Sequence, residues 1–305
     1  MTLNELKYIC ALAKEKQFKK AAEVCFISQP TLSVAIKKIE DELEVTLFER
    51  KKNEVLVTPI GEKIVFLANE ILNTSKQIKL LASNENKSQT ELKIGAIYTV
   101  GPYLLPKLIP IFHEISPKTH LIVEENYTHV LAQKLQQGEI DVMFISLPFH
   151  EPNIETLELY TEDFVAALPN QHPLAKHDRV SLEKITNETF LLLGSGHCFR
   201  DQVTEAYPNL IHMNYHSDNW QKTLEGSSLE TIRYMVASGA GITVLPCSSV
   251  QNQQNDLLTF KPLTDPVPNR TVIMAWRKTF PRKELIESLK QSIQKINFHC
   301  AVLEP

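Results

Sequence analysis

Residues 28–43 constrain the fold of this chain more than any other segment, because they combine a clear helix start with one apolar and one polar face. Ser28 is a favourable N-cap, and Pro30 is tolerated in the first turn, where its missing N–H would have no partner within the helix. Apolar residues recur at the spacing of one buried face, at Leu32, Ala35, Ile36, Ile39 and Leu43. The outward side carries small, hydrogen-bonding and basic groups, which are Gln29, Thr31, Ser33, Val34, Lys37 and Lys38.

Two shorter helices are predicted before this one, and a hairpin after it. Apolar residues recur at helical spacing in two sets, Leu3, Leu6, Tyr8, Ile9 and Leu12, then Phe18, Ala21, Ala22 and Cys25. Short helices joined by a tight turn, the last with a polar face, are typical of the helix-turn-helix that reads the major groove of DNA. The turn signal Lys52-Asn53-Glu54 between two β-prone runs predicts a wing. Residues 1–60 are therefore predicted to form a winged helix-turn-helix DNA-binding domain.

A single long helix is predicted from Gly61, followed by a polar linker at 83–90. Its apolar residues keep a heptad spacing, with Ile64, Ile71 and Ile78 at one position and Leu67, Thr74 and Leu81 at the other. This pattern favours a two-stranded dimer seam, so residues 61–90 are interpreted as a dimerisation helix and hinge. The alternative is one buried face that packs on its own domain.

Strands and helices alternate over 91–305, which predicts an α/β regulatory domain. The first series has strands at 92–97, 121–125 and 140–145 and helices at 102–114 and 130–137, and it predicts βαβ units in a mainly parallel sheet. The second has strands at 164–167, 190–193 and 242–245, a helix after Cys198, and a helix from Ser228 with a capping box of Ser227 and Glu230. A strand at 271–276 and a helix from about 282 to 296 close the chain. Two lobes are expected, 91–162 with 268–305 and 163–267, with a ligand cleft between them.

Length and composition agree with this division and limit the classes of function. A chain of 305 residues is long enough for two domains, and no stretch approaches the roughly 18 apolar residues of a membrane span. The N-terminus has no basic region followed by an apolar core, so a cytoplasmic protein without a membrane partner is expected. The net charge is -4, but the first ninety residues hold fourteen Lys or Arg against twelve Asp or Glu, which leaves -6 for the remainder. This asymmetry has the sign of a DNA-binding head on an acidic body.

Five cysteines without a CxxC pair are a poor disulfide framework and a poor zinc signature, so mostly free thiols are expected. Cys198 is the candidate for chemistry, because it follows a Gly-Ser-Gly-His run, precedes a predicted helix and has Arg200 two residues on. A helix N-terminus and a nearby cation stabilise a thiolate, the form that attacks a peroxide. The alternative is a half-buried structural side chain. The sequence holds no paired carboxylates, metal-ligand cluster or phosphate loop, so no metal, no cofactor and no other enzyme class is predicted.

Several motifs resemble the N-terminal signature of LysR-type transcriptional regulators. They are Phe18-x-x-Ala21-Ala22, Ser28-Gln29-Pro30-Thr31-Leu32-Ser33, Ile39-Glu40-x-Glu42-Leu43, Leu47-Phe48-Glu49-Arg50 and Thr58-x-x-Gly61. Residues 95–106, 196–202 and 228–237 resemble the peroxide-sensing branch, whose members activate hydrogen-peroxide-inducible genes under oxidative stress. The resemblance covers essentially the whole chain. It implies a winged helix-turn-helix, a linker helix and a two-lobed, periplasmic-binding-protein-like α/β regulatory domain.

The resemblance also implies roles for particular residues. Cys198 would react with peroxide to form sulfenic acid, inside a pocket of Thr99, Thr128, His197, Arg200 and Gln202. Gln29, Pro30, Thr31, Ser33, Val34 and Lys37 would meet base edges, and Arg50, Lys51 and Lys52 would contact phosphates. The implied partners are a double-stranded DNA operator, hydrogen peroxide, RNA polymerase and further copies of the chain in a homodimer or homotetramer. The structural alternatives are a strand-end or helix-cap hydroxyl for each threonine and a solvated face for each lysine.

Two positions depart from the family pattern. Glu44 replaces the usual glycine after the recognition helix, so the chain either forgoes a left-handed cap or strains it by about 1 kcal/mol. Tyr207 stands nine residues after Cys198, where the peroxide sensors usually carry a resolving cysteine. Cys247 is an alternative partner, although a core or loop role is favoured for it. We therefore expect a stable sulfenate or a mixed disulfide with a small thiol as the signalling species.

Two other functions remain as alternatives. One is a regulator that responds to a metabolite, a small anion in the cleft, with Cys198 passive. The other is a thiol peroxidase, which would need a resolving thiol and would leave residues 1–60 without a purpose. The expected protein is a regulator and not an enzyme.

Overall fold

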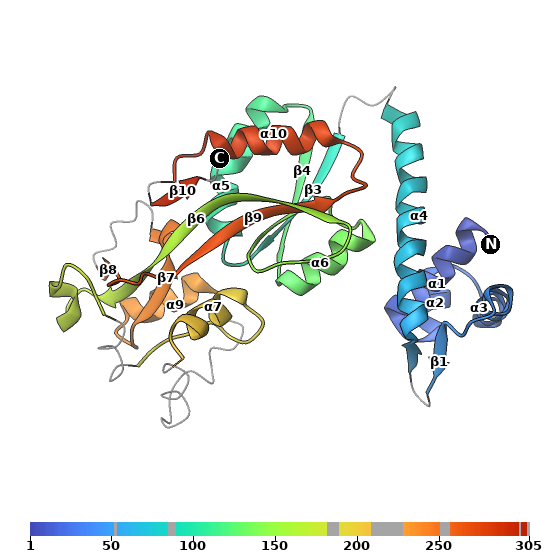
Figure 1. Ribbon diagram of the computed structural model, residues 1–305, viewed down its shortest axis with the longest axis horizontal. Coiled ribbons are helices and arrows are strands. Elements are labelled where there is room, and N and C mark those ends of the chain that lie inside the picture. Colours follow the sequence, from blue (N-terminus) through green and yellow to red (C-terminus); the bar gives the residue numbers. More distant parts are fainter. Residues whose placement is uncertain are drawn as a thin grey trace. The chain divides into compact units, whose positions relative to one another are not determined.

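The computed structural model describes residues 1–51, 54–84, 90–181, 189–208, 228–250, 257–298 and 300–303. The chain divides into two compact units, one of Met1–Thr90 with Gln133–Glu139 and one of Glu91–Ala132 with Ile140–Pro305 (Figure 1).

The N-terminal unit contains the predicted helix-turn-helix. Its helices are α1 (Leu3–Glu15), α2 (Phe18–Val24) and α3 (Gln29–Leu43), and strands β1 (Phe48–Arg50) and β2 (Val55–Val57) form an antiparallel hairpin. The Ser28 side chain accepts a hydrogen bond from the Thr31 N–H, which confirms the predicted N-cap of α3. The apolar faces of the helices meet in a core that includes Ile9, Leu12, Leu32, Ile36, Ile39 and Leu47. The tip of the wing, with Lys52 and Asn53, lies outside the described residues.

Glu44 ends α3 in the left-handed conformation, with φ 55° and ψ 32°, and its N–H donates to the carbonyl of Glu40. Of the two expected outcomes at this position, the structure therefore has the strained cap. A side chain with a Cβ is disfavoured at such a backbone geometry, whereas glycine adopts it without steric cost.

We expect Glu44→Gly to raise the free energy of unfolding by about 1 kcal/mol, because the strain of the cap is removed. Urea unfolding of the full chain, followed through the N-terminal unit, measures this change. Glu44→Ala is the matched control, since it removes the charge but keeps the Cβ. An equal gain from alanine would show that the charge, and not the backbone conformation, is the cause.

Helix α4 (Pro59–Asn84) uses two of its faces differently. Ala68 is buried, and Ile64, Val65 and Leu72 pack against the core of the helix-turn-helix. Leu67, Ile71 and Ile78 are 54%, 45% and 64% exposed. The residues of the heptad pattern therefore do not all lie on one face. Ile64 packs on its own domain, whereas Leu67, Ile71 and Ile78 face solvent. Nothing is described for the side chain of Leu81.

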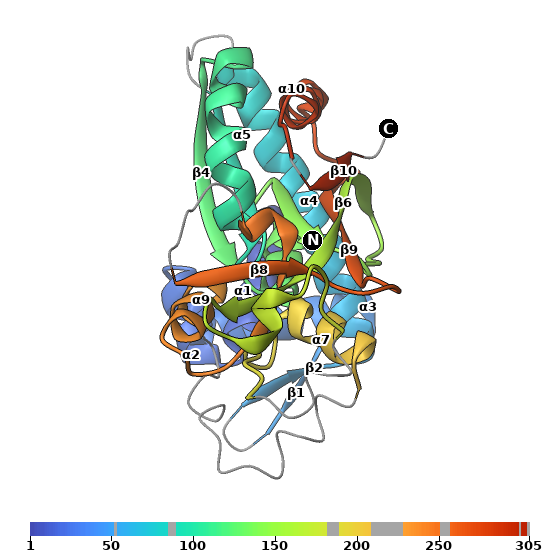
Figure 2. The same ribbon diagram turned by 90° about the vertical axis from the view of Figure 1, so that its left-hand side faces the viewer.

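The second unit is built on one mixed sheet of strand order β10-β6-β9-β5-β3-β4, with β7 and β8 also paired to β6 (Figures 1 and 2). Its first part contains β3 (Thr90–Ile97), α5 (Gly101–Ile115), β4 (Thr119–Asn126), α6 (Thr128–Gln137), β5 (Val142–Ser146) and β6 (Ile154–Pro169). Its second part contains α7 (Cys198–Ala206), α9 (Leu229–Ala237), β7 (Thr243–Pro246) and β8 (Leu258–Pro262). The chain returns through β9 (Asn269–Arg277), α10 (Lys283–Gln294) and β10 (Ala301–Leu303).

The prediction of a mainly parallel sheet is wrong. β3 and β5 pair in parallel, as a βαβ unit requires, but β9 is antiparallel to both β5 and β6, and β7, β8 and β10 are antiparallel to β6. A buried strand reads as an apolar run in either orientation, so the hydrophobic pattern could not distinguish the two.

Strand β6 belongs to both parts of this unit. Its residues from Ile154 to Asp163 pair with β9, those from Val165 to Pro169 pair with β8, and those from Phe164 to Ala167 pair with β7 on the other side (Figure 1). The predicted strand at 164–167 is thus the second half of a 16-residue strand.

Two local predictions in the second part are also corrected. Phe190 forms only an isolated bridge with Ile242, and not a strand over 190–193. The N-cap of α9 is Ser228, which accepts from the Thr231 N–H, while Ser227 lies outside the described residues. The Glu230 carboxylate accepts hydrogen bonds from Tyr103 and Arg233 instead of completing a capping box.

Candidate functional site

Cys198 is the first residue of α7, with His197 at the N-cap position. Its thiol is free and partly exposed, and its Sγ lies 3.4 Å from the Oγ of Ser146. Ser146 is the last residue of β5, so the thiol stands where a central strand ends and a helix begins.

A second hydrogen bond fixes the Ser146 hydroxyl. Gln202, one turn along α7, donates its Nε2 to Ser146 Oγ at 3.1 Å and to the carbonyl of Leu147 at 2.8 Å. Because Ser146 Oγ accepts from Gln202, its own hydrogen can be directed at Cys198 Sγ. Ser146 was not among the residues predicted from the sequence. The available signal was a polar residue at the carboxyl end of a buried strand, which is a common ligand position in α/β sheets.

His197 lies in an aromatic environment next to this thiol. Its ring is edge-on to Tyr127 and to Tyr98, with centroids 4.9 Å and 5.8 Å away. Burial lowers the pKa of the imidazole, so His197 is neutral near pH 7. A neutral imidazole offers one donor and one acceptor to a bound molecule.

Three predicted pocket residues carry buried polar atoms without a hydrogen-bond partner in the described part of the chain. They are Thr128 Oγ1, His197 Nε2 and Gln202 Oε1. Buried polar atoms in proteins are nearly always paired, so such atoms call for a small polar partner such as water or a ligand. Thr128 directly follows Tyr127, whose ring contacts His197.

Thr99 is held by a buried arginine that the sequence analysis did not consider. Arg270, in β9, donates from Nη1 to Thr99 Oγ1 at 2.9 Å and from Nη2 to the Thr99 carbonyl at 2.8 Å. Arg270 also forms an ion pair with Glu162 of β6 at 2.8 Å, and both side chains are 0% exposed. Its guanidinium carbon lies 5.3 Å from the ring centre of Phe199, the residue after Cys198. Since Thr99 Oγ1 accepts from Arg270, its own hydrogen can be donated to another acceptor.

The other two positions singled out around Cys198 have mainly local contacts. Arg200 donates from Nη1 to the carbonyl of Leu193 at 2.6 Å, which ties α7 to the segment before it. Tyr207 packs against the buried cluster of the second part of this unit, and burial raises the pKa of its phenol. Tyrosine at the usual resolving position thus has a packing role.

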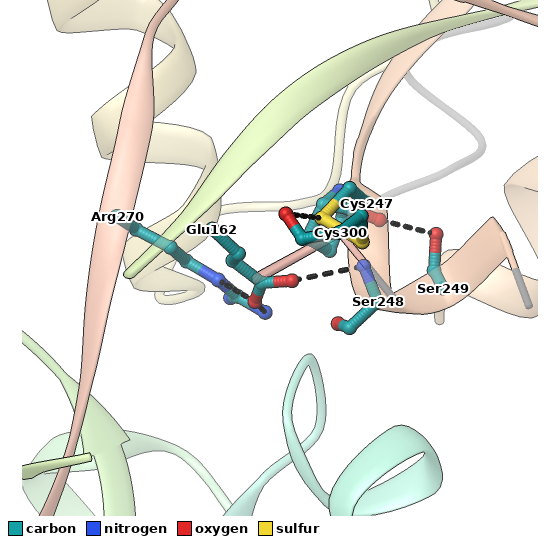
Figure 3. Close-up of a disulfide and its surroundings, with 7 residues drawn as sticks. Glu162, Cys247, Ser248, Ser249, Arg270 and Cys300 are labelled. Carbon is teal, nitrogen blue, oxygen red and sulfur yellow. Dashed lines mark hydrogen bonds and ion pairs between the residues drawn. A yellow bond between two sulfur atoms is a disulfide. The ribbon is translucent and has the colours of Figure 1, made fainter. Parts of the chain in front are cut away.

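The cysteine prediction needs one correction. Cys10, Cys25 and Cys198 are not disulfide-bonded, but Cys247 and Cys300 form a disulfide (Figure 3). The two cysteines are 53 residues apart in the chain, so no local motif could predict that they pair. With its sulfur bonded to Cys300, Cys247 is not a thiol that can resolve an oxidised Cys198.

The outward face of α3 is the candidate nucleic-acid interface. Gln29, Pro30, Thr31, Val34 and Lys37 are exposed along it, and Lys51 is exposed at the end of the first wing strand. Ser33 is half-buried and accepts a hydrogen bond from Arg50 Nη2 at 2.8 Å. The Arg50 guanidinium also lies 4.5 Å from the ring centre of Phe18, so Arg50 braces the wing against the helices.

Lys38, at the edge of this face, has a structural partner. Its Nζ lies 3.0 Å from Glu5 Oε1, and the hydrogen bond from Lys38 lowers the pKa of Glu5 to about 2. Lys38 therefore connects α3 to α1, while Lys37 points to solvent.

None of the helices in the described part of the chain combines the length and hydropathy needed to cross a bilayer. A helix-turn-helix joined to an α/β unit that carries a hydrogen-bonded thiol defines the class of protein, a transcriptional regulator with its own effector domain. Two family models match the chain: the bacterial regulatory helix-turn-helix protein of the lysR family over 3–62, and the LysR substrate binding domain over 85–296. The chain belongs to the LysR family of bacterial DNA-binding regulators.

Named relatives are similar over nearly the whole length. The chain is 36% identical over 297 residues to the hydrogen peroxide-inducible genes activator of Pectobacterium carotovorum subsp. carotovorum, covering 97% of this chain and 96% of the relative. It is 36% identical over 296 residues to the DNA-binding transcriptional dual regulator OxyR of Escherichia coli strain K12, covering 96% and 95%.

Solved structures agree with these relatives. A full-length OxyR variant from Pseudomonas aeruginosa is 47% identical, with a TM-score of 0.73 and coverage of 97% of this chain and 99% of that one. A hydrogen peroxide-bound OxyR mutant from Corynebacterium glutamicum is 30% identical, with a TM-score of 0.58 and coverage of 96% and 92%.

Proposed function

We propose that this protein is a cytoplasmic transcriptional regulator that senses hydrogen peroxide through oxidation of Cys198. The observation that carries the proposal is the free Cys198 thiol in hydrogen-bonding contact with Ser146, which is itself held by Gln202. The names of the relatives support it, since two are called hydrogen peroxide-inducible genes activator or OxyR and one solved neighbour is described as peroxide-bound.

In the proposed reaction the Cys198 thiolate attacks one oxygen of hydrogen peroxide. The S–O bond forms as the O–O bond breaks, sulfur loses two electrons, and the departing hydroxide takes a proton and leaves as water. The product is Cys198 sulfenic acid. The unpartnered Thr128 Oγ1, His197 Nε2 and Gln202 Oε1 would hold the peroxide, with the Thr99 hydroxyl as a further donor. Arg200 would add positive charge near the start of α7.

The proposed signalling state is the sulfenic acid or its mixed disulfide with a small thiol. Tyr207 occupies the resolving position and Cys247 is bonded to Cys300, so the described part of the chain offers neither as a free second thiol. We accordingly propose a regulator and not a peroxidase with turnover, because turnover would need a resolving step and a reductant.

For DNA we propose that α3 reads base edges of an operator through Gln29, Pro30, Thr31, Ser33, Val34 and Lys37. Arg50, Lys51 and Lys52 would contact phosphates, and the oxidised regulator would contact RNA polymerase. The proposed domains are 1–60 for DNA binding, 61–90 for dimerisation and 91–305 for regulation. The change of β6 partners after Asp163 supports a lobe boundary at 162/163.

The peroxide proposal is tested by titrating the full-length protein with hydrogen peroxide. We expect Cys198 to form a sulfenic acid, trapped by dimedone and located by mass spectrometry, with a parallel change in operator binding. Cys198→Ser should abolish both responses, and Cys25→Ser, which removes another free thiol, should preserve them. A Cys198 thiol that survives excess peroxide, or an operator response intact in Cys198→Ser, would reject the proposal in favour of the metabolite-responsive alternative.

We also propose that the exposed residues Leu67, Ile71 and Ile78 of α4 form a homodimer seam. Two such dimers would then assemble into a tetramer. Ile71→Glu places a charge in this seam and is expected to shift the protein toward monomer in sedimentation velocity. Val24→Glu is the control, because Val24 is an exposed apolar residue that belongs to α2 and not to α4. Unchanged sedimentation of Ile71→Glu would contradict the seam.

A further inference from the structure

The Cys247–Cys300 disulfide joins two segments that meet at one buried carboxylate. Cys247 begins the turn Cys247–Val250 after β7, and Cys300 immediately precedes β10. Ser248, next to Cys247, donates its N–H to Glu162 Oε2 at 2.9 Å (Figure 3). Ala301, next to Cys300, pairs with Glu162 in the ladder of β10 and β6. Both cysteines are therefore one residue away from a contact with Glu162.

Glu162 continues this connection toward the proposed peroxide pocket. Its Oε1 accepts from Arg270 Nε at 2.8 Å, and Arg270 holds the hydroxyl and the carbonyl of Thr99. Arg270 also lies against the Phe199 ring, one residue from Cys198. An unbroken series of direct contacts thus runs from the disulfide through Glu162 and Arg270 to the start of α7.

The two sulfur-bearing residues differ in accessibility. Cys247 is 4% exposed, whereas Cys300 is an exposed residue. A thiol in solution can therefore approach Cys300 but not Cys247. Exchange reactions of disulfides depend on access to the attacked sulfur and on the thiol that leaves, so this asymmetry defines one route of attack.

We propose that Cys247 and Cys300 form a second redox-active site, which exchanges with small-molecule thiols and sets the reactivity of Cys198. The link to Cys198 as a sensor rests on the proposed function, whereas the exchange itself does not. We call the site closed when the Cys247–Cys300 disulfide is formed and open when it is reduced. In the closed state the disulfide joins the two segments that contact Glu162, and Glu162 in turn holds Arg270, which contacts Thr99 and Phe199 of α7.

The exchange balances with thiols alone. A small thiolate attacks Cys300 Sγ, the Cys247–Cys300 bond breaks, and Cys247 leaves with the electron pair and is protonated. A second small thiolate attacks the small-molecule sulfur of the mixed disulfide, so a small-molecule disulfide forms and Cys300 leaves with the electron pair and is protonated. Two electrons pass from two thiols to the protein, and the reverse sequence with a small disulfide closes the site again.

Opening the site removes the covalent clamp on Glu162. The three residues of β10 then remain on β6 by strand pairing alone, and the Ser248 N–H keeps its hydrogen bond to Glu162 without a covalent link between the two segments. Coupling between sites connected by packed and hydrogen-bonded residues commonly changes a rate by a small multiple. We expect the reactivity of the Cys198 thiol to change by about threefold or more between the two states.

The experiment uses the full chain with and without dithiothreitol, removed before assay. Iodoacetamide labelling in denaturant followed by peptide mass spectrometry should leave Cys247 and Cys300 unlabelled in the untreated protein and label both after reduction. The labelling rate of Cys198 is followed in the native protein of the same two preparations and should differ between them. Cys300→Ser should reproduce the rate of the reduced protein without reductant. Cys10→Ser, which replaces a cysteine of the other unit that is outside the disulfide, should leave the rate of the untreated protein unchanged.

Two results would overturn the inference. Labelling of Cys247 and Cys300 in the untreated protein even after exposure to a small disulfide would show that the site does not close. An identical Cys198 rate in both states would show that closure does not reach the pocket. Because iodoacetamide reports thiol reactivity without peroxide, a Cys198 that reacts with iodoacetamide but not with peroxide would reject the proposed function and not this inference.

Discussion

Replacing Arg270 by methionine is expected to lower the free energy of unfolding by about 3–5 kcal/mol, since removal of one partner leaves a buried charge uncompensated. The Glu162 carboxylate is 0% exposed and would lose its ion pair with Arg270, while Thr99 would lose two hydrogen bonds. Urea or thermal unfolding of the full chain, followed through the transition of the second unit, measures the loss.

Two controls make this result interpretable. Arg179→Met removes an arginine that pairs with Asp265, and the side chains of this pair are 56% and 87% exposed. This variant should lower the free energy of unfolding by at most about 1 kcal/mol. Glu162→Gln combined with Arg270→Met removes both charges and should recover part of the loss. If Arg270→Met lowered the free energy of unfolding no more than Arg179→Met does, the buried pair of Arg270 and Glu162 would not stabilise the second unit as expected.

Replacing Gln29 by alanine is expected to weaken binding to the preferred operator by about 1–3 kcal/mol and to leave binding to unrelated duplexes nearly unchanged. Gln29 is exposed at the first turn of α3, where a side-chain amide can make two hydrogen bonds to a base edge. Fluorescence anisotropy with an operator selected from random duplexes measures both affinities.

Lys51→Ala is the matched variant for phosphate contact. It should weaken binding to all sequences alike and reduce the slope of log affinity against log salt by about one. Equal loss of specific and unspecific binding in both variants would contradict the division between a base-reading helix and a phosphate-contacting wing.

The local features of the fold could be predicted from sequence because their causes are local. The start of α3 follows from the hydroxyl of Ser28 and the proline after it, and the strained end at Glu44 follows from the absence of glycine. The antiparallel return of β9 could not be predicted, because strand orientation depends on partners more than 100 residues away, as in the pairing of Glu158 with Ile273.

The same distinction applies to the candidate site. Cys198, His197 and Gln202 lie in one segment, so a sequence motif could predict them together. Ser146 and Arg270 belong to distant strands, so no local motif includes them. The Cys247–Cys300 pair was missed for the same reason, since two cysteines far apart in a chain with no repeated spacing show no preference for each other. Sequence thus identified the candidate thiol but not the residues from distant strands around it.

Strand β6 has a mechanical consequence. Because one unbroken backbone is hydrogen-bonded to β9 before Asp163 and to β7 and β8 after it, the two halves of this unit cannot slide past each other without rupturing a ladder. The chain passes between the halves a second time between β8 and β9, so two covalent connections join them. A change in the orientation of one half would therefore bend or twist β6 itself, and this strand would transmit the strain to the ladders on both of its sides.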